Sequence, residues 1–126
     1  MTDAEIDRFL ADEGYPEHVR QQGRHGLIAR WQRFVSDVER GWTLGIEDYW
    51  NELDIRDLIA RLGSASEVAD ADARMRALLV EPELVHWESE TPDAFWIRGY
   101  PRNASPEFVE ELRANCPFAA ESRKPE

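Results

Sequence analysis

The sequence contains a single cysteine, Cys116, among its 126 residues. A lone cysteine cannot form a disulfide within the chain, so packing must stabilise the fold. Its neighbours Asn115 and Pro117 carry no charge that would activate the thiol, which favours a buried and unreactive side chain. Paired cysteines and an HExxH motif are both missing, so the sequence shows no familiar zinc site.

Long apolar runs are missing as well. None approaches the roughly 18 residues that a membrane-spanning helix requires. The chain starts with the acidic segment 1–5, and no basic region followed by an apolar stretch is present there, as a secretory signal would require. We therefore expect a cytoplasmic protein with no membrane partner.

Basic residues are scarce, with 15 against 26 acidic ones and a formal net charge of −11. This charge disfavours contact with the phosphates of nucleic acids and with anionic lipids. The acidity is uneven, because residues 21–40 form the one net-basic stretch, through Arg24, Arg30, Arg33 and Arg40. Part of the charge is therefore expected to be neutralised inside the molecule, and the remainder suits a basic protein partner.

The first part of the chain has helical patterns. Thr2 and Glu5 match the capping box that begins a helix, and Gly14 ends it. Pro16 suits the first turn of a second helix. Gly23 and Gly26 predict a break or bend in that helix, because glycine weakens a helix interior.

The strongest helical pattern follows this break and continues to Gly41. Its apolar side chains lie on one arc: Leu27, Ile28, Trp31, Phe34, Val35 and Val38. Residues 46–62 then carry two apolar stripes offset by half a helical turn. Either one central helix is buried on two sides, or the helix breaks near Asp54. We favour the break, because Asp54 can cap a new helix and Asp57 suits its first turn.

Two further helices are predicted later in the chain. A second capping-box match, Ser64 to Glu67, begins a helix whose apolar residues run to Leu79 and which Pro82 closes. The segment 105–107, Ser-Pro-Glu, begins the last helix.

Between these helices the apolar pattern changes to a period of two. Val85 and Trp87 alternate with polar residues, and Phe95 and Ile97 alternate again after the turn-forming segment 91–93. The predicted fold class is therefore mainly α (α+β). We expect one helical domain over residues 1–120, of five to six helices with a small β-hairpin late in the chain, and a disordered tail at 121–126.

Four charged residues lie on or near the apolar stripes and are candidates for buried ion pairs: Arg24, Arg30, Asp72 and Arg76. A buried guanidinium must find a carboxylate, and the acidic segments on either side supply many. Arg76 follows Asp72 by one helical turn, in the favourable acid-before-base order. Whether Asp72 meets Arg24 instead is left open by the sequence.

The predicted hairpin offers a candidate interaction surface. If its apolar residues face the core, then His86, Trp96, Arg98 and Tyr100 point away from it, and Trp42 can join them. Tryptophan, tyrosine and arginine are enriched at the hot spots of protein interfaces. In the alternative, the last helix covers this face and the side chains form a second core layer.

Catalytic and metal-binding patterns are weak. The sequence has no nucleophile elbow, phosphate loop or dinucleotide motif. His18 and His25 lie two helical turns apart, too far to bind one metal alone, and His86 is distant from both. The carboxylates of residues 47–57 lack the arrangement of a calcium loop. We expect no metal and no cofactor.

The leading hypothesis is a non-catalytic protein-binding or regulatory module of bacterial type. Its most concrete form is an acidic inhibitor of a basic partner, as immunity proteins and antitoxins are. One alternative is a small hydrolase or metal-dependent enzyme that pairs His18 or His25 with Asp72. Another is a self-associating structural protein whose exposed tryptophans form the contact between two copies.

Overall fold

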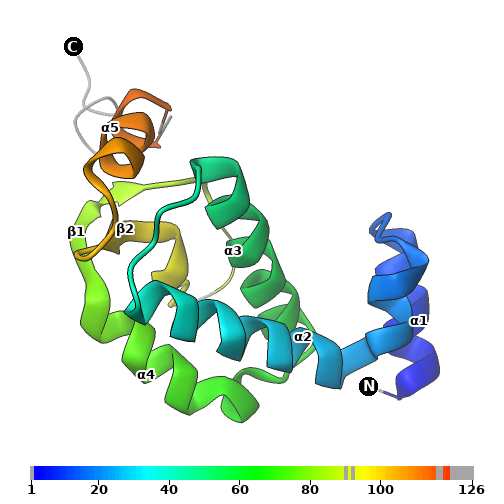
Figure 1. Cartoon of the computed structure of the whole chain (residues 1–126). Coiled ribbons are helices and arrows are strands. Elements are labelled where there is room, and N and C mark those ends of the chain that lie inside the picture. Colours follow the sequence, from blue (N-terminus) through cyan, green and yellow to red (C-terminus); the bar gives the residue numbers. More distant parts are fainter. Residues whose placement is uncertain (1, 90, 92, 116–117, 120–126) are drawn as a thin grey trace.

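The computed structural model describes residues 2–89, 91, 93–115 and 118–119. These residues form five α-helices, two short 3-10 helices and a small antiparallel sheet (Figure 1), which confirms the mainly α fold class. In chain order the elements are α1 (Asp3–Asp12), α2 (Glu17–Glu39), α3 (Ile46–Arg61), η1 (Ala65–Val68), α4 (Ala69–Leu78), β1 (Leu79–Val85), η2 (Phe95–Ile97), β2 (Arg98–Pro101), α5 (Pro106–Asn115) and β3 (Phe118–Ala119). Cys116 and the expected tail at 121–126 lie outside the described residues.

The first helix, α1, and the last helix, α5, begin where the sequence predicted. Thr2 and Glu5 form the complete capping box of α1, with the side chain of each accepting from the backbone N–H of the other. At the start of α5, the Ser105 hydroxyl accepts from the backbone N–H of Phe108 at 3.3 Å. Both caps satisfy backbone donors that a helix start leaves free.

The predicted break in the second helix is confirmed at Gly23, where φ is 60° and ψ is −153°. This backbone conformation is open to glycine and closed to L-residues with a side chain. The break turns the first part of α2 toward α1, and the two pack through Ile6, Leu10 and Val19, which are buried. Figure 1 shows this pair at one side of the molecule, away from the sheet.

The expected break at Asp54 is wrong, because α3 is one continuous helix. Its two apolar stripes are both buried, with Tyr49 and Leu53 among one set and Ile55 and Leu58 among the other. The helix packs against α2 and also against α5 and η2, as its central place in Figure 1 shows. A helix covered on two sides needs no cap in its middle, and Asp54 is exposed.

The capping box expected at Ser64 is also wrong. Gly63 ends α3 with a φ of 74°, and the Ser64 backbone N–H then donates to the Ile59 carbonyl. Ser64 is thus tied to the end of the preceding helix, and its side chain makes no cap. The next residues form the 3-10 helix η1, and α4 begins only at Ala69.

The hairpin is present but begins earlier than the sequence suggested. Leu79 lies in β1 rather than in the helix, and it pairs with Pro101 of β2. The pairing is irregular between Val80 and Val85, and Pro82 lies in this interval, where its missing N–H disturbs no regular ladder. The strand order is β2-β1-β3, because β3 adds to the other edge of β1.

The core joins the helices to the sheet through aromatic side chains. The rings of Phe34, Trp42, Tyr49 and Phe108 contact one another at centroid distances of 5.1–5.7 Å, in edge-on geometry. Such pairs add to the stabilisation that comes from burying their area. Within the described residues, no helix combines the length and the apolar character that crossing a bilayer demands.

We expect the substitution Gly23→Ala to destabilise the protein by roughly 1–3 kcal/mol, because no Cβ is tolerated at its φ and ψ without strain. The measurement is the free energy of unfolding in urea. Ala73→Gly at an exposed position of α4 calibrates an ordinary helix substitution, at about 1 kcal/mol. An unfolding free energy equal to that of the original protein would show that the bend does not depend on Gly23.

Candidate functional site

The predicted aromatic surface does not exist as an exposed patch. Trp42, His86 and Trp96 are buried, at 5%, 2% and 2% exposure, so placing them on the surface was wrong. Arg98 is exposed and Tyr100 is half-buried. Trp42, His86 and Trp96 belong to the core instead, because side chains of α2 and α3 cover them. Trp96 moreover lies in η2, where strand alternation does not apply.

His86 has a structural role. Its Nδ1 accepts a hydrogen bond from Trp50 Nε1 at 2.8 Å, and its Nε2 donates to the Gly99 carbonyl at 2.6 Å. The ring also stacks on Tyr49. Burial lowers the pKa of His86 to about 4, so the ring is neutral near pH 7. With both nitrogens engaged, His86 has no free site for a metal or a transferred proton.

This histidine predicts a loss of stability in mild acid. In the unfolded chain its pKa is near 6.5, against about 4 in the folded protein. Between these values only the unfolded state binds the proton, so stability falls as the pH drops from 6.5 toward 4, by roughly 3 kcal/mol in total. Urea unfolding across this range should show that His86→Gln, although less stable at pH 7, loses less stability with acid. Parallel pH profiles of the two proteins would contradict this.

Asp72 forms a buried ion pair, but with Arg56 rather than with the expected Arg76. Arg56 Nη2 and Nε contact the two carboxylate oxygens at 2.7 and 2.9 Å, and the two side chains are 4% and 13% exposed. Trp31 Nε1 donates to the same carboxylate at 3.0 Å. The flat face of the guanidinium lies 4.1 Å from the Trp96 ring.

The other three candidates for buried ion pairs differ in their burial and in their contacts. Arg30 is half-buried and pairs with Glu52 at 2.7 Å, as an intramolecular pair was expected to. Arg76 is exposed and lies over the Phe95 ring at 4.2 Å, so it is no buried partner of Asp72. Arg24 is half-buried. The sequence missed Arg56 because a break at Asp54 would have moved it away from the core.

Removing one member of the Arg56–Asp72 pair should leave a buried charge without its partner. We expect Asp72→Leu and Arg56→Met each to lower the free energy of unfolding by about 3–5 kcal/mol. The double variant should recover part of that loss, because it buries no charge but leaves the buried Trp31 N–H without its acceptor. Urea unfolding of the four proteins in this cycle measures the coupling, and additive losses would show that the two charges act independently.

A groove of about 440 Å³ lies between α2 and α3 and is called here the α2–α3 groove. Its lining comes from both parts of α2, from the segment 40–45 and from α3: His18, Gln22, Arg30, Arg33, Phe34, Asp37, Trp42, Leu44, Asp48, Asn51 and Glu52. The bend at Gly23 separates His18 and Gln22 from the rest of α2. The groove thus depends on the break that the sequence predicted.

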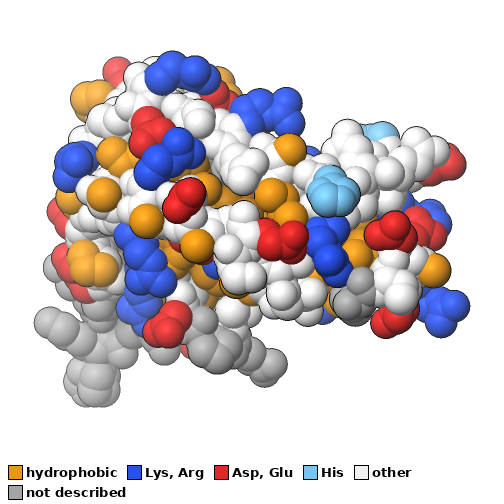
Figure 2. Space-filling model, turned by 90° about the horizontal axis from the view of Figure 1, so that it is seen from below, with side chains coloured by type: hydrophobic (Ala, Val, Ile, Leu, Met, Phe, Trp, Pro, Cys, Tyr) orange, Lys and Arg blue, Asp and Glu red, His pale blue; other side chains and the backbone are white. Residues whose placement is uncertain are grey.

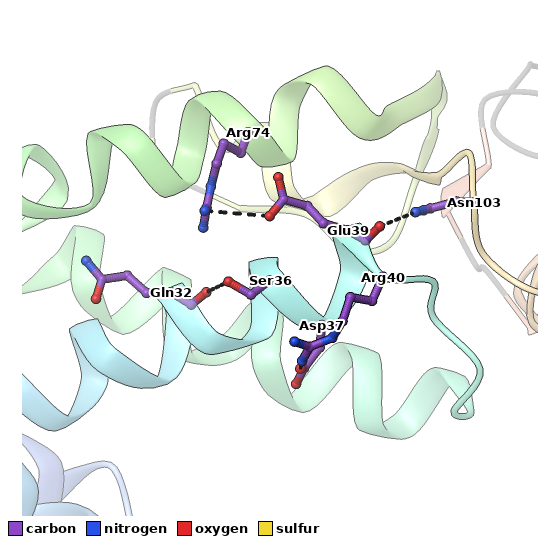
Figure 3. A network of polar contacts seen from close by, with 7 residues as sticks. All are labelled: Gln32, Ser36, Asp37, Glu39, Arg40, Arg74 and Asn103. Atoms are coloured by element: carbon purple, nitrogen blue, oxygen red, sulfur yellow. Dashed lines mark hydrogen bonds and ion pairs between the residues drawn. The ribbon is translucent and has the colours of Figure 1, made fainter.

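Hydrogen bonds from residues 103 and 105 fix the end of α2 and the segment 40–45, which supplies part of the groove lining. The Asn103 side-chain amide donates to the carbonyls of Val38 and Glu39 at 3.0 Å, and Figure 3 shows Glu39 also reaching Arg74 of α4. Further along, the Ser105 backbone N–H donates to the Trp42 carbonyl at 2.9 Å. These bonds fix the chain where it supplies groove residues.

The start of α3 is fixed by a side chain from α5. Glu111 Oε1 accepts from the Ile46 backbone N–H at 2.9 Å, which replaces a cap from the preceding Gly45. This contact links residues 65 positions apart, so no local pattern could reveal it. The contact fixes the first turn of α3, which carries the groove residue Asp48.

The groove has an apolar floor and a polar rim. Phe34 and Trp42 are buried beneath it, whereas Leu44 is 55% exposed and is the one large apolar side chain so exposed among the described residues. An apolar centre surrounded by polar groups is the anatomy of a protein-binding surface. The exposure of Leu44 could not be predicted from the sequence, because a single leucine in a loop belongs to no periodic apolar pattern.

Two opposite charges on the rim are unpaired. Arg33 and Asp48 make no ion pair within the described part of the chain, whereas Arg30 is paired with Glu52 and Asp37 with Arg40. Figure 3 shows the Asp37–Arg40 pair on a different side of α2 from Glu39 and Arg74. The α2 side of the groove therefore offers a free cation, and the α3 side a free carboxylate.

Unpaired carboxylates continue along α3. In the part of the chain that the structure describes, Glu47, Asp48, Asp54 and Asp57 form no ion pair. Partial burial raises the pKa of Asp54, and the negative charge of Asp57 raises it further. These like charges destabilise one another, and a cation placed nearby would relieve the repulsion.

The structure does not assemble the catalytic pair that the sequence left as an alternative. His18 and His25 are both exposed, and neither contacts Asp72, whose oxygens are engaged by Arg56 and Trp31. Among the described residues, no three side chains of histidine, cysteine or acidic type gather as metal ligands would.

Comparisons of the chain with protein-family models, with curated proteins and with solved structures find no match.

Proposed function

We propose that the protein is a non-catalytic binding module whose α2–α3 groove takes a basic segment of a partner protein. The observation that carries this is the combination of an apolar floor with a free carboxylate, Asp48, at the α3 rim. In the proposed complex an apolar side chain of the partner packs on Leu44, and a neighbouring lysine or arginine pairs with Asp48. The role envisaged is that of an acidic, cytoplasmic inhibitor.

The charge of the whole chain supports the choice of a basic partner. A net charge of −11 attracts cations over distances comparable to the Debye length and increases the rate of encounter. It cannot by itself select a binding face, since acidic and basic side chains are mixed over the face in Figure 2. The unpaired carboxylates of α3 supply that local preference.

Arg33 limits which basic segments fit. Its free guanidinium on the α2 side of the groove repels a segment that carries cations along both edges. The partner segment is therefore expected to place its cations on the α3 side alone. Arg33 and Asp48 should therefore have opposite effects on the affinity for the partner segment, and variants of the two residues can test this difference.

The test uses a phage-displayed library of random peptides selected on the intact protein. Enriched sequences should combine lysine or arginine with an aliphatic or aromatic residue. In fluorescence anisotropy with one enriched peptide, Asp48→Asn should weaken binding about fivefold, the size of one charge pair. Leu44→Ser should weaken it too, whereas Arg33→Gln should strengthen it.

Asp12→Asn is the matched control, because it removes an exposed carboxylate of α1 that lies outside the groove. It should leave the affinity close to that of the original protein. Two results would overturn the proposal: enriched peptides with no excess of cations, or equal effects of Asp48→Asn and Asp12→Asn, which would mean attraction by total charge without a groove.

A further inference from the structure

A second concave surface lies where α4 meets the sheet. It is a cavity of about 520 Å³, called here the α4–β2 pocket, and it is lined by Arg76 of α4 and Arg98 of β2. It shares no lining residue with the α2–α3 groove. Its function can therefore be tested separately from the binding of a basic partner.

The two arginines of this pocket differ from most others in the chain. Seven arginines of the described residues form ion pairs, whereas Arg76 and Arg98 form none. Both are exposed. In a chain with 26 acidic residues, two cations that line one cavity without carboxylate partners are available to an anion from outside.

Arg76 is held in place by an aromatic ring. Its guanidinium carbon lies 4.2 Å from the centre of the Phe95 ring, a cation–π contact. A cation–π contact does not use the N–H donors of the guanidinium in hydrogen bonds, so they are available to bind oxygen atoms. Arg98 makes one long contact, from Nη1 to the Pro82 carbonyl at 3.5 Å, so its remaining donors are also free.

The rest of the lining suits a flat organic ligand. Phe95 and Trp87, both half-buried, contribute aromatic surface to the pocket. The Ser89 hydroxyl accepts from the Thr91 backbone N–H at 3.1 Å, which leaves its own hydrogen free to donate. Aromatic walls, two guanidinium groups and a hydroxyl are together the groups that recognise an aromatic ring bearing an oxyanion.

Two acidic residues restrict the ligand further. Glu88 and Asp93 also line the pocket and are exposed. They repel a ligand that carries negative charge at several points, such as a polyphosphate or a stretch of nucleic-acid backbone. The pocket therefore selects a small anion with one charged head.

We propose that the α4–β2 pocket is a binding site for a small aromatic oxyanion. The carboxylate or phosphate of the ligand contacts Arg76 and Arg98, and its ring packs against Phe95 and Trp87. This site is additional to the α2–α3 groove. It gives the module a means of responding to a small metabolite as well as to a protein.

The test titrates the full-length protein with phenyl phosphate, benzoate and inorganic phosphate. Amide chemical shifts in two-dimensional NMR spectra report where each probe binds, without any variant. Phenyl phosphate or benzoate should shift the amides of residues 85–98, and inorganic phosphate should bind at least about tenfold more weakly, because it lacks the ring. Equal binding of inorganic phosphate, or shifts elsewhere alone, would overturn the proposal.

Variants then identify the groups responsible. Arg76→Gln and Arg98→Gln should each weaken binding of the tighter aromatic probe about tenfold, the effect of losing one charge-assisted contact. Arg102→Gln is the control, since Arg102 is exposed, lies next to β2, forms no ion pair with any residue that the structure describes and does not line the pocket. If Arg102→Gln weakens binding as much as the other two, the pocket has no specific role. Affinity of the α2–α3 groove for its basic peptide should be unchanged in all three variants.

Discussion

The ion pair between Arg56 and Asp72 joins four elements of the fold at one point. Arg56 projects from α3 and Asp72 from α4, Trp31 of α2 donates to the same carboxylate, and Trp96 of η2 covers the guanidinium. A charge buried to 4% exposure is stable only if its partner is in place, so these elements must dock together. The pair therefore specifies an arrangement, whatever its net contribution to stability.

The continuity of α3 is what brings this pair together. A break at Asp54 would have rotated Arg56 away from α4, and the two apolar stripes of α3 would have belonged to different helices. The stripes are instead two sides of one helix, which packs against α2, α5 and η2. Little of the α3 surface is left to solvent, and acidic residues occupy it.

Local patterns predicted the parts of the fold that local forces decide. The capping box at Thr2, the bend at Gly23 and the cap at Ser105 depend on backbone donors and conformations within a few residues, and all three were predictable. The change from helical to alternating pattern likewise predicted the late hairpin. Its start at Leu79 was not predictable, since an apolar residue there suits either a helix end or a buried strand.

The candidate site was predictable only in fragments. The sequence singled out Trp42 and the carboxylates of residues 47–57, but it placed Trp42 on an exposed patch and considered the carboxylates as metal ligands, whose arrangement they lack. What unites them is a bend at Gly23 and a side chain, Glu111, that reaches α3 from the far end of the chain. Contacts over such separations leave no periodic pattern in the sequence, so the bend at Gly23 was predictable and the groove that forms beside it was not.

The ion pairs of the structure show how the net charge of −11 is distributed over the fold. Seven arginines form ion pairs with carboxylates within the described part of the fold, and Glu47, Asp48, Asp54 and Asp57 of α3 are among the carboxylates left outside these pairs. Among the described residues, Arg76 and Arg98 beside the sheet are left without a carboxylate partner. The proposed groove and the proposed pocket share no lining residue, so a cationic segment bound at the first and a small anion bound at the second would not compete for the same side chains.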